Sequence, residues 1–166
     1  MALTVEDGSG VVGANSYTDV AAARAYATAR GVTLPAADAD VEVLLVKAMD
    51  YIESLRNRYQ GERTYTSVTN NLVWPRQGVY VDDEIVAHNA IPQLLKDAQA
   101  QLAMDAQTAD LMPTGAGREV IRERVEGAVE VEYNPLGITN IQPVLQKAKA
   151  LLAPLMMASY LRTVRV

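Results

Sequence analysis

Residues 38–58, DADVEVLLVKAMDYIESLRNR, form the stretch that decides the fold. Apolar residues recur there at steps of three and four from Val41 to Leu55, so they line one face of a helix. Asp38 or Asp40 supplies a helix start signal, and the polar residues after Leu55 supply the end. Because a single amphipathic helix cannot bury its own apolar face, the stretch predicts that further helices pack against it.

Three further helices are predicted on either side of this stretch. Residues 16–30 begin with a Ser-x-x-Asp capping box and continue as an alanine-rich helix. An apolar stripe predicts another helix over residues 91–111, with a proline tolerated in its first turn. Pro143 opens a last helix, which Pro154 must kink or divide because proline cannot donate a helical hydrogen bond.

Residues 118–133 change to strand-like alternation and predict a β-hairpin. A two-residue turn would set two glutamates opposite each other across the strands, which is repulsive. Shifting the register by one residue places Arg124 opposite Glu130 and Arg122 opposite Glu132, so charge favours this second register. Since a lone hairpin is only marginally stable in water, we expect it to lie on the helices or on a neighbouring subunit.

Together these elements predict a mainly α protein, a small bundle of about four helices with one β-hairpin and extended terminal arms. We expect a flexible N-terminal segment over residues 1–15, a helical domain over residues 16–158 and a C-terminal arm over residues 159–166. The single tryptophan, Trp74, precedes Pro75 in an extended segment and is expected to anchor the core. The sequence contains no apolar run long enough to predict a membrane-spanning helix.

Composition leaves little material for catalysis or for metal binding. The chain has no cysteine, which excludes disulfides, thiolate metal sites and thiol nucleophiles, and His88 is its only histidine. The acidic residues 82–84 lack the alternate spacing of a calcium loop, and neither a nucleophile elbow nor a phosphate loop occurs. We therefore expect a protein that is not an enzyme and that carries no cofactor and no metal.

Nucleic-acid binding is a separate hypothesis, because basic and aromatic residues occur close together twice. Acidic residues interleave the first of these groups, tyrosines are often packed inside, and the net charge of −5 argues against wholesale coating by nucleic acid. The sequence thus gives no clear basic groove lined by aromatic rings, although single-strand binding stays open as an alternative. The two groups are Arg118, Arg122 and Arg124, and Arg56, Arg58 and Arg63 with Tyr59 and Tyr65.

The order of several motifs resembles a tailed-phage family labelled DnaT-like single-stranded-DNA-binding protein, and also the head–tail connector (adaptor) proteins beneath the portal. The resemblance covers residues 16–158, and its most specific parts are the W-P-R-x-G block and the hairpin block. The motifs, in chain order, are SY-x-D-x-x-x-A-x-x-Y (residues 16–26), L-x-x-A-x-D-Y-I (45–52), L-x-W-P-R-x-G-V (72–79), I-P-x-x-L-K-D-A-Q-x-x-L-A (91–103) and V-x-G-x-V-E-V-E-Y (125–133).

The connector half of the resemblance implies a virion protein that is assembled in the host cytoplasm and located at the head–tail interface. Its partners would be the portal protein, a tail-side stopper or tail-completion protein, further copies in a ring of about twelve, and the genomic DNA that passes through the channel. The DnaT-like half implies a replication accessory that binds single-stranded DNA.

We favour the connector, because the sequence offers no basic groove lined by aromatic rings to support the DnaT-like role. The connector also explains the terminal segments, which are too polar or too short to belong to the core, yet could become ordered on a partner. Alternation at residues 163–166 could add a strand to a portal or neighbour sheet. The residues expected at the portal or neighbour interface are Leu161, Arg162, Thr163, Val164, Arg165, Val166, Arg122 and Arg124.

Overall fold

The computed structural model describes residues 2–66, 72–112, 120–125, 129–133 and 145–157. This part of the chain contains four α-helices, two short 3₁₀ helices and three antiparallel strand pairs, so the prediction of a mainly α fold with a hairpin is confirmed. The helices are α1 (Val20–Thr28), α2 (Asp38–Ser54), α3 (Gln93–Asp105) and α4 (Gln146–Leu152), and the 3₁₀ helices are η1 (Arg56–Arg58) and η2 (Ala153–Leu155).

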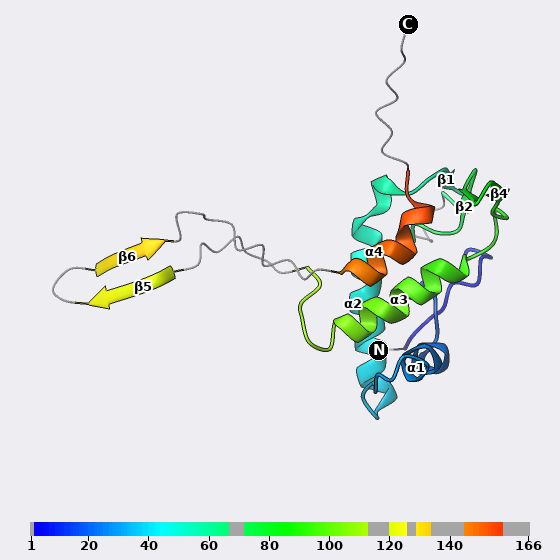
Figure 1. The fold of residues 1–166 in the computed structure, drawn as a ribbon. Coiled ribbons are helices and arrows are strands. Elements are labelled where there is room, and N and C mark those ends of the chain that lie inside the picture. Colours follow the sequence, from blue (N-terminus) through cyan, green and yellow to red (C-terminus); the bar gives the residue numbers. More distant parts are fainter. Residues whose placement is uncertain (1, 67–71, 113–119, 126–128, 134–144, 158–166) are drawn as a thin grey trace, which may run out of the picture.

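Helix α3 is the centre of the bundle, because it packs against α1, α2 and α4 (Figure 1). Every residue from Ala98 to Met104 is buried, so α3 is covered on more than one side. The side chains of the alanines at positions 98, 100 and 103 are small, so neighbouring helices can pack close to the α3 backbone on more than one side. Helix α2 buries the predicted stripe from Val41 to Ile52 against this centre, which confirms the amphipathic interpretation.

The helix ends differ in detail from the sequence expectations. Asp19 caps α1 by accepting a hydrogen bond from the Ala22 amide at 2.7 Å, whereas the Ser16 hydroxyl donates to the Thr18 carbonyl at 2.6 Å. The predicted capping box at Ser16 is therefore wrong, because that hydroxyl is used inside the core. Pro154 lies in η2, directly after α4, so the predicted division of the last helix is confirmed.

Among the described residues, two of the strand pairs have strands of two residues each, and the third pair has strands of six and five residues. Strands β1 (Glu62–Arg63) and β2 (Arg76–Gln77) pair with each other, as do β3 (Tyr80–Val81) and β4 (Glu84–Ile85). Strands β5 (Val120–Val125) and β6 (Val129–Tyr133) form the predicted hairpin, which Figure 1 shows apart from the four helices.

The register of this hairpin is the one that charge favours. Arg122 lies opposite Glu132, Arg124 lies opposite Glu130, and Val125 lies opposite Val129. A register shift between Val120 and Arg122 then brings Val120 opposite Tyr133. Cross-strand charge pairing was therefore a sufficient guide to how the two strands align.

The N-terminal segment differs from the expectation of a flexible arm. The Glu6 amide donates to the Ser16 carbonyl at 2.8 Å, and Thr4 and Asn15 exchange two hydrogen bonds of 2.8 Å. The segment thus folds back on the residues that precede α1, and Glu6 is fully buried. The glycines of this segment predicted a flexible backbone, whereas in the structure their positive φ angles allow a tight loop. The C-terminal arm lies outside the described residues, and no helix in the described ranges has the length and apolarity needed to cross a membrane.

Candidate functional site

The predicted anchor, Trp74 with Pro75, lies at the centre of the irregular segment between α2 and α3. The Trp74 side chain is fully buried and meets the Tyr59 ring edge to face, with 5.8 Å between the ring centroids. Trp74 and Pro75 are joined by a cis peptide bond. The tryptophan is thus a core residue, with none of its side chain exposed for contact with a partner.

Arg76 extends this anchor with a buried guanidinium group that binds backbone carbonyls. Its Nε donates to the Gln60 carbonyl at 2.6 Å, and its terminal nitrogens donate to the carbonyls of Gly61, Tyr59 and Val73. Burial lowers the pKa of Arg76 from its ordinary value, because the charge is removed from water. The donors of Arg76 are therefore used to hold residues 59–61.

Glu53 organises a second, partly buried network at the end of α2. Its Oε1 accepts hydrogen bonds from the Tyr17 hydroxyl at 2.8 Å and from the Val73 amide at 2.9 Å. Its Oε2 accepts from Arg56 at 2.9 Å, and the Tyr17 hydroxyl in turn accepts from the Trp74 amide at 3.1 Å. Arg56 is therefore partnered by a carboxylate of the fold.

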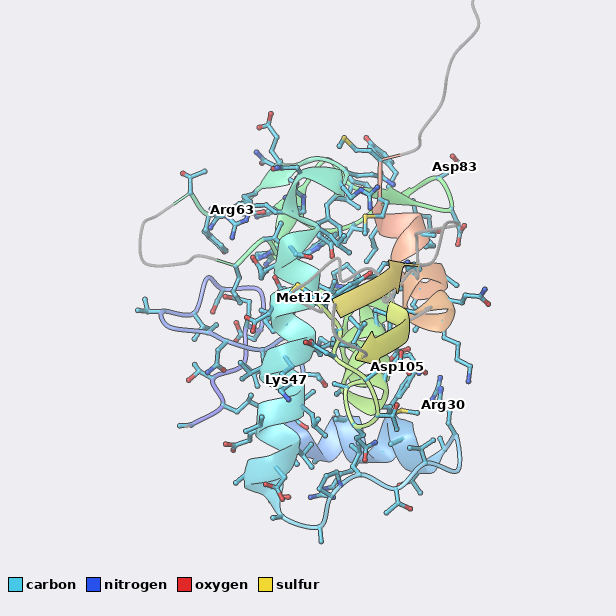
Figure 2. All side chains as sticks on the ribbon, turned by 90° about the vertical axis from the view of Figure 1, so that its left-hand side faces the viewer. Arg30, Lys47, Arg63, Asp83, Asp105 and Met112 are labelled. Carbon is cyan, nitrogen blue, oxygen red and sulfur yellow. The ribbon has the colours of Figure 1, made fainter. Side chains whose placement is uncertain are left out.

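The basic and aromatic residues proposed from the sequence as a DNA surface do not assemble as one. Tyr59 is buried, and the Tyr65 hydroxyl donates to the Gly8 carbonyl at 3.2 Å. Figure 2 shows Arg63 and Asp83 on opposite sides of one end of the molecule. The side chains of Arg122 and Arg124, all of Arg118, and the expected interface residues Leu161 to Val166 lie outside the description.

A hollow of about 790 Å³ does bring an aromatic ring and basic groups together, and we call it the Tyr51 hollow. It lies between the end of α2 with η1 on one side and α4 with η2 on the other. Backbone hydrogen bonds hold these two walls together, since Met157 donates to the Arg58 carbonyl at 2.8 Å and Gln60 donates to the Leu155 carbonyl at 3.0 Å. The lining residues are Tyr51, Leu55, Asn57, Arg58, Lys149, Leu152, Ala153, Met156 and Met157.

The lining of the Tyr51 hollow contains two cations and no acidic residue. Arg58 and Lys149 are exposed, while Tyr51 is half-buried beside them. Burial raises the pKa of the Tyr51 phenol, and the positive charge of Arg58 partly opposes that rise, so the ring stays neutral near pH 7. On a chain with a net charge of −5, such a lining is locally positive.

Of the residues that line this hollow, only Arg58 belongs to the basic groups noted in the sequence, although one further signal for the hollow exists. Tyr51, Leu55 and Arg58 follow one another at steps of four and three, which places them on one face of α2 and its η1 extension. Lys149 gives no such signal, because its position opposite that face depends on how α4 packs.

A metal-binding arrangement is not found in the described ranges. No group of three or more histidine, aspartate and glutamate side chains there is placed to hold a metal ion. Asp82 and Asp83 form the exposed turn between β3 and β4, with φ angles of 52° and 66°. His88 is exposed, and its carbonyl accepts a hydrogen bond from the Thr64 hydroxyl.

Comparison with known proteins places the chain in a family. The model of the family described as "Putative DnaT-like ssDNA binding protein" matches residues 1–166. No match was found to a curated protein or to a solved structure. This finding supports the DnaT-like half of the resemblance and gives no support to the connector half. Because the match spans the whole chain, the protein belongs to the family of DnaT-like ssDNA-binding proteins.

Proposed function

We propose that the protein binds single-stranded DNA and that the strand lies in the Tyr51 hollow. The observation that carries the proposal is the lining of that hollow, where a tyrosine ring lies with two cations and no acid. Family membership supports the same ligand class, since the family is described as binding single-stranded DNA. The candidate DNA surface read from the sequence offers no comparable lining, because its tyrosines are packed against the fold.

In this proposal the Tyr51 ring stacks on one base, while Arg58 and Lys149 contact the flanking phosphates. Every base has a flat π face, so stacking of this kind tolerates any sequence. Leu55, Met156 and the rest of the apolar lining would cover the sugar and the edge of the base. The binding is expected to be weak and salt-dependent, because only two cations meet the phosphate backbone at the hollow.

Substitutions in the hollow give the test, with oligo-dT binding followed by fluorescence anisotropy across a salt series. Tyr51→Leu is expected to weaken binding by about 5–150-fold, which corresponds to the stacking energy of one base. Arg58→Ala and Lys149→Ala should each reduce the slope of log K against log salt by about 0.7, the value for one phosphate contact on a single strand.

Lys47→Ala is the matched control, because this lysine lies on α2 outside the hollow (Figure 2). It is expected to leave the affinity near that of the wild type. Equal affinities and equal salt slopes for the hollow variants and for this control would contradict the proposed site.

A second candidate function is the connector role, and the β5–β6 hairpin favours it. The hairpin is inserted between α3 and α4, and the main contacts of its strands, among the described elements, are with each other. Since a two-stranded hairpin is only marginally stable alone in water, docking on a neighbouring subunit or on a portal protein would stabilise it. In this role the ring encloses the channel for genomic DNA.

Mass spectrometry of purified phage particles tests the connector role. The connector role predicts that the protein is present in amounts similar to those of the portal subunit. If the protein is abundant in infected cells but missing from particles, the connector role is wrong and DNA binding away from the virion remains. DNA binding in the hollow is measured separately, so the two results are independent.

A further inference from the structure

The N-terminal loop surrounds a buried carboxylate with backbone amides. Oε1 of Glu6 accepts hydrogen bonds from the amides of Gly8 at 2.8 Å and Gly10 at 2.9 Å, and Oε2 accepts from the Val11 amide at 2.8 Å. The Glu6 side chain is fully buried. Converging backbone N–H groups of this kind form a nest, which is a common way for proteins to bind anions.

The shape of the nest is fixed by its surroundings as well as by Glu6. Gly8 and Gly10 have φ angles of +109° and +81°, a region that residues with side chains rarely adopt, and these angles help to turn the amides inward. A Cβ on Gly8 would lie 1.9 Å from the Asn89 carbonyl oxygen, and one on Gly10 would lie 2.9 Å from the Tyr65 ring. The loop therefore packs closely against Asn89 and Tyr65, which are distant in sequence. We expect these contacts to keep the amides pointing inward when the Glu6 side chain is removed.

Glu6 itself enters the nest from a short extended segment. Val5 forms a parallel bridge with Ser16, and the Glu6 amide donates to the Ser16 carbonyl at 2.8 Å. The carboxylate and this bridge hold the first residues of the chain against the body. The anion in the nest is thus the Glu6 carboxylate, and by binding it the nest holds the N-terminal segment in place.

We propose that the amides of Gly8, Gly10 and Val11 form a carboxylate-binding site that Glu6 occupies intramolecularly. A carboxylate fits better than a phosphate, because Asp7 adjoins the site and repels a second negative charge. An external carboxylate takes this place when the Glu6 side chain is removed. The site lies in the N-terminal loop, apart from the residues that line the Tyr51 hollow, and does not depend on DNA binding.

Chemical rescue of the full-length Glu6→Ala variant tests this site. The variant leaves three inward amides without their carboxylate, so its Tm is expected to fall below that of the wild type. Sodium acetate should raise the Tm of the variant in a saturable way, compared with sodium chloride at equal ionic strength. Inorganic phosphate should raise it less. The wild type should not respond, because its own carboxylate is always close to the nest.

Glu62→Ala is the control, since it removes an exposed carboxylate on β1 and should gain nothing from acetate. Equal Tm values in acetate and in chloride for a folded Glu6→Ala variant would overturn the proposal. If that variant is unfolded in chloride, acetate should restore its far-UV circular dichroism in a saturable way. A variant that stays unfolded at every acetate concentration would overturn the proposal equally.

Discussion

Replacing Trp74 with alanine is expected to lower the free energy of unfolding by about 3–5 kcal/mol. The indole is fully buried and packs edge to face against Tyr59. Its Nε1 has no hydrogen-bond partner within the described part of the protein, so the loss comes from packing and from the cavity that remains. Urea unfolding followed by far-UV circular dichroism measures the effect, since the variant has no tryptophan fluorescence.

Two further variants separate packing from other effects of the substitution. Trp74→Phe keeps an aromatic ring in the same place and should cost clearly less than alanine. Tyr80→Ala removes a ring that is 54% exposed, so its effect should stay within about 0.5 kcal/mol. If Trp74→Ala unfolds at the wild-type urea concentration, the tryptophan does not anchor the core.

Local patterns in the sequence were sufficient for much of the fold. The apolar stripe of α2 follows from helix periodicity, and the buried residues from Val41 to Ile52 are those that the spacing indicates. The hairpin register follows from charge alone, because only one alignment pairs the arginines of β5 with the glutamates of β6. Both are short-range physical rules, which one sequence can express without knowledge of the rest of the molecule.

The central position of α3 could not be predicted in this way, because it depends on long-range contacts. Gln99 shows why, since a glutamine in a helix usually indicates a solvated face. Here Gln99 is fully buried, and its Oε1 accepts from the Tyr17 amide at 2.8 Å. Its Nε2 donates to the Ser16 hydroxyl at 2.9 Å and to the Leu45 carbonyl at 3.0 Å. These partners are 54 to 83 residues away in sequence, and no local pattern announces them.

The candidate sites were missed for the same reason. The nest around Glu6 looks in sequence like a flexible glycine-rich arm, because its order depends on Asn89 and Tyr65. The Tyr51 hollow needs two walls, and only one of them, the face of α2, has a recognisable spacing. By contrast, the W-P-R-x-G block was recognised as specific before the structure explained it. The arginine of this block, Arg76, binds the backbone carbonyls of four residues.

Replacing Arg76 with methionine is expected to destabilise the protein by about 2–4 kcal/mol. The guanidinium is buried and donates to the carbonyls of residues 59–61 and of Val73, so its removal leaves these acceptors without their donor. Methionine keeps much of the apolar volume, which limits the effect to the lost hydrogen bonds. Urea unfolding followed by tryptophan fluorescence measures the change, because Trp74 lies two residues away.

Arg76→Lys shows whether the positive charge or the geometry of the guanidinium stabilises the protein through these carbonyls. A lysine keeps the positive charge but has one terminal nitrogen, so it cannot reproduce a fork that donates in several directions. We expect it to recover less than half of the lost stability. The matched control is Arg24→Met, because Arg24 forms an exposed ion pair with Asp38 at 2.8 Å, and such pairs contribute about 0–1 kcal/mol. Full stability of Arg76→Lys would mean that charge alone holds the loop, while full stability of Arg76→Met would mean that the carbonyls are satisfied by water.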